Sequence, residues 1–277
     1  MATWPNFFIA GASKCGTSSL HAYLQTIPGI YMSRIKEPNY FSRLAIADDN
    51  PMVKPVRDEQ QYLRLFEEAS DAKVVGESSP SYLEDPEAPF LIERTAPGAK
   101  VLVSLRDPVE RLYSHYLMML NSRPGLGSFQ QEIERGLALQ QNRSLAVLAP
   151  DLGLYYEQVL RFRSVFGADR FKVILFEEFT ADVPATLREV LDFLGIDHPV
   201  ANFKATVYRE YGVARGPIVR YLWGNRTISQ AAEVLIPTSL RRFIRETFLV
   251  KKVPKPKMDP EAREFLQRYY ADDVSRL

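Results

Sequence analysis

The stretch "NFFIAGASKCGTSSLHAYL" (residues 6–24) joins an apolar run to a helix-like segment through a loop that carries two glycines. An apolar run without polar alternation is typical of a strand buried on both faces, as in a parallel sheet. A strand, a glycine-bearing turn and a helix N-terminus aim backbone N–H groups and the positive end of the helix dipole at one point. The stretch therefore predicts an anion site beside a buried strand.

The loop differs from the phosphate loop of ATP and GTP enzymes. In that loop, GxxxxGK[ST], a lysine follows the second glycine, whereas here Thr17 follows Gly16 and Lys14 lies between the glycines. The Lys14 ammonium is therefore expected beside a phosphate near the turn and not along a triphosphate. A tight turn capped by Ser13 or Thr17, with Lys14 in solvent, is an alternative that the loop alone leaves open.

Three further apolar runs, "AKVVGE", "KVLVSLRD" and "RFKVILFEE", each precede a segment with helical spacing (residues 86–96, 108–121 and 184–194). This alternation predicts an α/β class protein, a three-layer P-loop-like fold with a central parallel sheet flanked by helices. Residues 128–167 predict a helical insert, and residues 217–277 predict C-terminal helices split by an exposed loop, "KKVPKPK" (251–257). We expect one domain over residues 1–277.

Composition limits the classes of function. The 277 residues carry 35 Lys and Arg against 34 Asp and Glu, so no overall field attracts nucleic acid. No apolar run approaches the roughly 20 residues that span a bilayer, so no stable membrane insertion is expected. Cys15 is the single cysteine, which excludes an intrachain disulfide, and the three histidines are scattered, so no metal site is expected. With no signal peptide visible, we expect a cytoplasmic protein that starts near Met1.

A second anion site is predicted by "VLVSLRDPVERLYSHYLM" (residues 101–118), a buried strand followed by a proline-initiated helix. Arg106 ends the strand and Ser114 lies about two turns into the helix, so together they offer a guanidinium fork and a hydroxyl to one phosphate. Ligands bind at the carboxyl ends of parallel strands, which puts both sites in one crevice. The alternative is that Arg106 pairs with Asp107 or Glu110 and Ser114 is merely exposed.

The segments "SKCGTSSLHAYL", "KEPNYF", "GESSPSYL" and "LRDPVERLYSHY", in this order and spacing, resemble the sulfotransferases that use 3'-phosphoadenosine 5'-phosphosulfate, especially the heparan-sulfate type and its bacterial relatives. The resemblance covers residues 6–120, and "ARGP" (214–217) extends it weakly. It implies in-line transfer of a sulfuryl group to an acceptor hydroxyl, with that nucleotide as donor co-substrate and no required metal.

The resemblance also implies roles for individual residues on the donor side. Lys14 would stabilise charge that grows on the leaving phosphate oxygen. The residues expected at the 5'-phosphosulfate are Lys14, Cys15, Gly16, Thr17, Ser18 and Ser19, those at the 3'-phosphate are Arg106 and Ser114, and those of a later closing loop are Arg215 and Gly216.

On the acceptor side, the resemblance makes Glu37 of "KEPNYF" the general base that takes the acceptor proton. Glu77 is the second candidate for this base. The alternatives are that Glu37 pairs with Lys36 or Arg34 and that Glu77 contacts the amides of the serines after it. Further residues expected at the acceptor are Lys36, Tyr40, Ser78 and Tyr82.

The sequence departs from the family pattern at Ser78, where heparan-type enzymes carry a lysine. Either Lys36 compensates or the acceptor differs. A net charge of +1 offers no strongly basic groove, so a small or weakly charged acceptor, such as a sugar, lipid or metabolite hydroxyl, is expected rather than a polyanion. The rival interpretations are an ATP-dependent metabolite kinase and a nucleotide-binding protein without activity.

Overall fold

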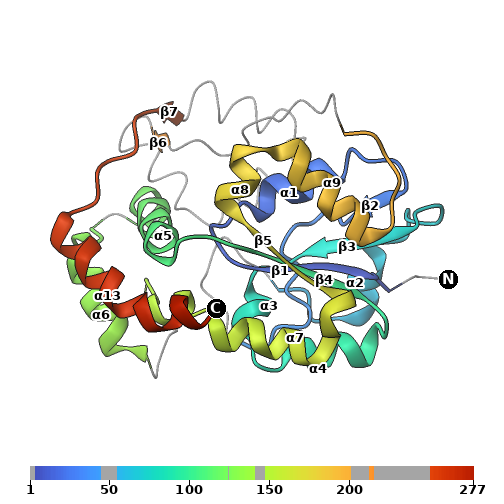
Figure 1. Ribbon diagram of the computed structural model, residues 1–277, viewed down its shortest axis with the longest axis horizontal. Coiled ribbons are helices and arrows are strands. Elements are labelled where there is room, and N and C mark those ends of the chain that lie inside the picture. Colours follow the sequence, from blue (N-terminus) through green and yellow to red (C-terminus); the bar gives the residue numbers. More distant parts are fainter. Residues whose placement is uncertain (1–3, 45–54, 124, 141–146, 201–211, 215–249) are drawn as a thin grey trace.

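The computed structural model describes residues 4–44, 55–123, 125–140, 147–200, 212–214 and 250–277. Its centre is a five-stranded parallel sheet in the order β2-β3-β1-β4-β5 (Figure 1). Its strands are β1 (Phe7–Gly11), β2 (Ile30–Met32), β3 (Val74–Ser78), β4 (Lys100–Leu105) and β5 (Phe171–Leu175). The predicted central parallel sheet is confirmed, and β1 lies at its middle between β3 and β4.

Helices cover both faces of this sheet and one end of it (Figure 1). One face carries α1 (Thr17–Leu24), α8 (Phe176–Ala181) and α9 (Val183–Leu194). The other carries α2 (Glu59–Arg64), α3 (Ser81–Glu84), α4 (Ala88–Thr95) and α7 (Tyr156–Arg170). Next to the carboxyl ends of the strands lie α5 (Pro108–Ser122), α6 (Phe129–Ala138) and α13 (Pro260–Arg276).

The central strand shows why the apolar runs lack polar alternation. Successive side chains of a strand point to opposite faces of the sheet. Phe8 and Ala10 pack into the core on the α4 and α7 face, whereas Phe7 and Ile9 pack into the core on the α1 and α9 face. Because helices cover both faces, every residue of β1 is buried.

Several short elements were not predicted, namely β2, α2, α3 and α8. Each has between three and six residues, which is too short for a hydrophobic period to be visible. The insert is helical, with α6, a 3-10 turn at Pro150–Gly153 and α7, but α7 continues to Arg170. Gly167, where the insert was expected to end, interrupts the helical geometry with a φ of 69°.

The C-terminal part (residues 217–277) was predicted to contain helices and showed no strong strand signal. Its last helix is present as α13, but it also contributes β7 (Val250–Lys252), which pairs antiparallel with β6 (Gly212–Ala214) ahead of that part. The first two lysines of the expected "KKVPKPK" loop therefore lie in a strand, which three residues are too few to signal. The two helices expected at residues 229–236 and 239–249 lie outside the described residues.

Candidate active site

The loop between β1 and α1 is shaped by its neighbour β4. Ser104 Oγ donates a hydrogen bond to the Cys15 carbonyl at 2.6 Å, and the Ala12 N–H donates to the Ser104 carbonyl at 2.7 Å. Lys14 and Gly16 adopt left-handed backbone, with φ of 70° and 80°. The neighbouring strand thus holds the loop in a conformation that an isolated chain would rarely adopt.

Gly16 opens the N-terminus of α1 to an anion. It is the N-cap residue, and no side chain caps the helix there. A Cβ at this position would lie 2.9 Å from a ring carbon of Phe176, so glycine is required by space as well as by φ. The first amides of a helix lack intrahelical acceptors and lie at the positive end of its dipole. The amides of Thr17 and Ser18 are therefore suited to a phosphate or sulfate, whereas the Ser19 N–H donates to the Gly16 carbonyl at 2.9 Å.

The Cys15 side chain points away from this opening into the core. It is buried, with Sγ 3.9 Å from the Tyr155 hydroxyl. Burial raises the pKa of the thiol to about 11. The thiol is therefore neutral at pH 7, and only the backbone of Cys15 can serve the predicted anion site.

Arg106, at the end of β4, reaches the same loop. Its Nη1 donates to the Lys14 carbonyl at 3.5 Å, and its guanidinium lies 4.5 Å from the centre of the Phe176 ring. The alternative pairing with Glu110 exists only at 3.9 Å. The Nε atom is buried and donates to no residue that the structure describes. A buried, unsatisfied donor beside a loop with open amides is what an anion would complete.

Lys14 contacts α5 on the helix face that also carries Ser114. Lys14 Nζ donates to Met118 Sδ at 3.5 Å. Ser114 precedes Met118 by four residues, which puts both on one face of α5. The hydroxyl of Ser114 therefore belongs to the helix face that meets the loop.

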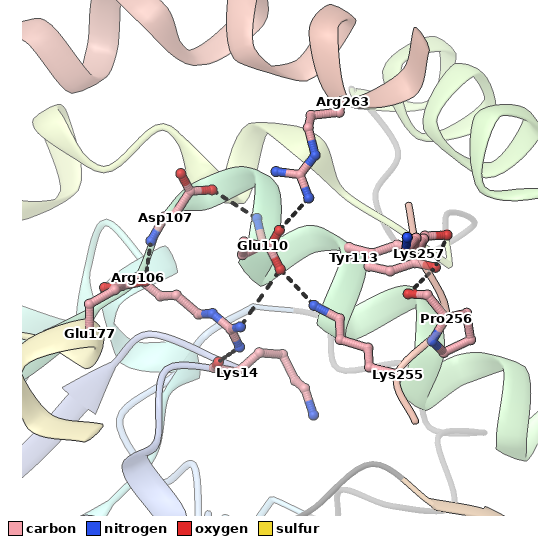
Figure 2. Close-up of polar contacts among 10 residues, drawn as sticks. All are labelled: Lys14, Arg106, Asp107, Glu110, Tyr113, Glu177, Lys255, Pro256, Lys257 and Arg263. Atoms are coloured by element: carbon pink, nitrogen blue, oxygen red, sulfur yellow. Dashed lines mark hydrogen bonds and ion pairs between the residues drawn. The ribbon is translucent and has the colours of Figure 1, made fainter. Parts of the chain in front are cut away.

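Glu110 joins this region to a segment that sequence reasoning assigned to an exposed loop (Figure 2). Lys255 and Arg263 each approach the Glu110 carboxylate at 2.6 Å. Burial by itself would raise the pKa of Glu110, but the bonds from these two cations lower it. A pocket of about 330 Å³ lies between α5 and this segment, lined by Tyr113, Lys255, Pro256, Lys257, Met258 and Arg263. The only sign of this pocket in the sequence was the alternation of lysine and proline in "KKVPKPK".

Glu37 lies on the other side of the loop, beyond the end of β3. Its N–H donates to the Ser78 carbonyl at 2.9 Å, and its carboxylate forms an ion pair with Lys36. The predicted alternative of a pair with Lys36 therefore occurs, whereas Arg34 pairs with Glu68 instead. The Glu37 side chain remains 36% exposed, which leaves the carboxylate open to another molecule.

Glu77 is fully buried below this segment. Its carboxylate accepts hydrogen bonds from the hydroxyls of Tyr62, Ser79 and Tyr82. Burial raises the pKa of Glu77 to about 7, against the opposing effect of these hydroxyls and of Lys36. The contact is with hydroxyls and not with the serine amides that the sequence suggested.

The other residues expected at the acceptor differ in exposure. Ser78 and Tyr82 are fully buried, so their side chains do not face an open surface. Tyr40 is half-buried and stacks on Tyr62 with ring centres 4.2 Å apart. Lys36 pairs with Glu37, whose N–H donates to the Ser78 carbonyl, so a cation lies near Ser78. Arg215 and Gly216 lie outside the described residues.

Within the described ranges, no helix is long and apolar enough to cross a bilayer. In the same part of the chain, His, Cys, Asp and Glu side chains form no group of three or more that could hold a metal ion.

Comparison with known proteins shows which family the chain resembles. The profile of a group described as "Sulfotransferase family" matches residues 5–199. Human carbohydrate sulfotransferase 15 is 30% identical over an alignment of 248 residues; the match covers 69% of this chain and 44% of that protein. Human heparan sulfate glucosamine 3-O-sulfotransferase 6 is 29% identical over 72% of this chain and 54% of its own length.

A solved structure agrees with this assignment. The sulfotransferase from Alicyclobacillus acidocaldarius superposes with a TM-score of 0.75 and 30% identity, and the match covers 99% of this chain and 94% of that one. By contrast, the chain spans about half the length of the two human relatives.

Proposed function

This chain belongs to the sulfotransferase family, and we propose that it transfers a sulfuryl group from 3'-phosphoadenosine 5'-phosphosulfate to an acceptor hydroxyl. The observation that carries the proposal is that two anion-binding arrangements share one loop. The open N-terminus of α1 lies beside Lys14, and Arg106 contacts the carbonyl of the same Lys14. The donor carries a 5'-phosphosulfate and a separate 3'-phosphate, so its charges match two such arrangements.

We assign different residues on the donor side to the two charged groups of the donor. The donor supplies an electrophilic sulfur and a phosphate leaving group. We assign Lys14 and the amides after Gly16 to the phosphosulfate, where the ammonium stabilises charge on the leaving oxygen. Arg106 and Ser114 bind the 3'-phosphate, which satisfies the buried Nε of Arg106.

On the acceptor side, we assign the general base to Glu37. Its partly exposed carboxylate takes the hydroxyl proton as the oxygen forms its bond to sulfur. We assign Lys36 as the cation that compensates for the lysine absent at Ser78, because it pairs with Glu37 and its charge lowers the pKa of Glu77.

A sugar hydroxyl is the acceptor that the names of the relatives favour. The balanced charge of the chain favours a neutral or weakly charged molecule over a polyanion. Lipid and small-metabolite hydroxyls belong in the same screen.

Calorimetry followed by a turnover assay tests the proposal. Without added metal, 3'-phosphoadenosine 5'-phosphate should bind at least about tenfold more tightly than AMP, because one charge-assisted contact is worth about 1.5–3 kcal/mol. Equal affinities would overturn the donor assignment, and a preference for ATP with magnesium would indicate a kinase. Labelled donor and a panel of hydroxyl acceptors then separate an enzyme from a nucleotide-binding protein without activity.

A further inference from the structure

Glu77 is a carboxylate that the proposed donor and base assignments leave without a role. Its exposed fraction is 0%. The Tyr62 and Tyr82 hydroxyls donate to its Oε1, and the Ser79 hydroxyl donates to its Oε2 at 2.7 Å. A carboxylate enclosed in this way does not meet an acceptor molecule directly.

Two of these three hydroxyls also bind the segment that carries Glu37. Ser79 Oγ accepts a hydrogen bond from the Asn39 N–H at 3.0 Å. The Tyr82 hydroxyl accepts one from the Phe41 N–H at 3.4 Å. Each hydroxyl has a single hydrogen, and because that hydrogen goes to Glu77, the oxygen lone pairs face the segment. Ionised Glu77 therefore orients both hydroxyls to accept from the backbone of residues 37–41.

The segment depends on such contacts because its backbone is unusual. Glu37 and Asn39 have φ of 64° and 51°, in the left-handed region that residues other than glycine rarely adopt. Asn39 Nδ2 donates to the Glu37 carbonyl at 2.7 Å, which couples the two residues. Backbone in such a region persists where the surroundings determine it.

We infer that Glu77 is a positioning residue for Glu37, acting through the hydroxyls of Ser79 and Tyr82. The inference rests on the proposed function, which gives the placement of Glu37 its importance. A protonated Glu77 carries a hydrogen of its own. One of the three hydroxyls must then accept that hydrogen and turn its own away from Glu77. When Ser79 or Tyr82 is that hydroxyl, its orientation toward the segment changes, whereas a turn of the Tyr62 hydroxyl leaves these backbone contacts in place. The protonation state of Glu77 thereby acts on the geometry of the base.

Burial raises the pKa of Glu77 to about 7. The groups that oppose this rise are the hydroxyls of Tyr82 (α3), Ser79 (end of β3) and Tyr62 (α2) and the charge of Lys36, which precedes the segment of residues 37–41 (the base segment). As pH falls through about 7, the protonated form increases and the base segment loses part of its support. The maximal rate should fall with it, and Glu77→Gln should remove this limb of the pH profile.

A matched pair of variants tests the positioning without any assay of activity. Tyr82→Phe and Tyr62→Phe each remove one hydroxyl from the same oxygen of Glu77, but only the Tyr82 hydroxyl also accepts from the backbone of the base segment. Both variants keep the ring, so the stacking of Tyr62 on Tyr40 is retained. The hydrogen-exchange rates of the Asn39 and Phe41 amides should increase about three- to tenfold in Tyr82→Phe and in Ser79→Ala. This is the change in rate that corresponds to the free energy of one lost hydrogen bond. Tyr62→Phe should leave it within about twofold. Equal exchange in Tyr82→Phe and Tyr62→Phe would overturn the inference.

A double-mutant cycle tests whether Glu77 acts through Glu37. Glu77→Gln should lower the maximal rate but not the affinity for 3'-phosphoadenosine 5'-phosphate, and it should cause no further loss in a Glu37→Gln background. Losses that multiply would show that Glu77 acts independently and would contradict the inference. A wild-type chain that fails to bind the nucleotide would instead refute the proposed function, while the exchange experiment would still measure the contacts of Glu77.

Discussion

The two sides of the β1 loop carry opposite charge and are held in different ways. On the β4 side, Lys14 and Arg106 are held by a main-chain carbonyl, a methionine sulfur and an aromatic ring. On the β3 side, Glu37 and Glu77 are held by a neighbouring lysine and by hydroxyls. The proposed anion binding depends on the ends of rigid elements, whereas the proposed placement of the base depends on a series of side chains. Substitutions on the proposed acceptor side should therefore leave donor affinity unchanged, and substitutions on the proposed donor side should leave the placement of the base unchanged.

The largest effect is expected on the acceptor side. Glu37→Gln keeps the size of the side chain but removes the proton acceptor, so turnover should fall about a hundredfold to ten-thousandfold. Binding of 3'-phosphoadenosine 5'-phosphate, measured by calorimetry, should not change. Glu77→Gln should reduce the rate less. If Glu77 proved essential and Glu37 dispensable, the base would have to be moved to β3.

A smaller effect on the rate is expected at the loop that separates the two sides. Lys14→Ala should lower kcat about a hundredfold to a thousandfold, because the ammonium acts on charge that develops in the transition state. Donor affinity should change less, since the amides of α1 still hold the ground-state anion. Steady-state kinetics separates the two parameters. Loss of affinity with an intact maximal rate would make Lys14 a binding residue only.

Arg106→Ala tests the donor side alone. Affinity for 3'-phosphoadenosine 5'-phosphate should fall about ten- to a hundredfold, which corresponds to the loss of one charge-assisted contact of about 1.5–3 kcal/mol. AMP, which lacks the 3'-phosphate, serves as the control ligand and should bind as before. An equal loss of affinity for both nucleotides would mean that Arg106 supports the loop and does not bind the 3'-phosphate.

The smallest effect concerns stability at the edge of the donor side. Glu110→Gln should lower the free energy of unfolding by about 0.5–1 kcal/mol at pH 7, since the partners Lys255 and Arg263 are partly exposed. The pKa of Glu110 is lowered by folding, so its contribution is present above the ordinary value of 4.5 and is lost as pH falls below it. Urea unfolding at pH 7 and pH 3.5 measures this difference. Glu67→Gln, at an exposed position, is the control and should show none.

That Arg106 lies beside the β1 loop could be predicted from the sequence because the signals for this placement are local. The loop residues and Arg106 each lie directly after a buried strand, and parallel strands bring their ends together. Lys255 could not be found in this way, because its contact with Glu110 joins residues 145 positions apart. The surroundings of Glu77 were also missed, since Tyr62 belongs to a six-residue helix without a visible period. Arg215 and Gly216 stay predictions.

The aromatic ring beneath Arg106 has a consequence for the kinetics of nucleotide exchange. The face of Phe176 attracts the guanidinium through its π electrons, 4.5 Å from the ring centre, and so restrains the group without using its N–H donors. A side chain already confined to one orientation loses little further rotational freedom when a ligand arrives. Arrival of the nucleotide should therefore be limited by diffusion and not by a search among arginine rotamers. Phe176→Leu should then slow association more than it accelerates dissociation.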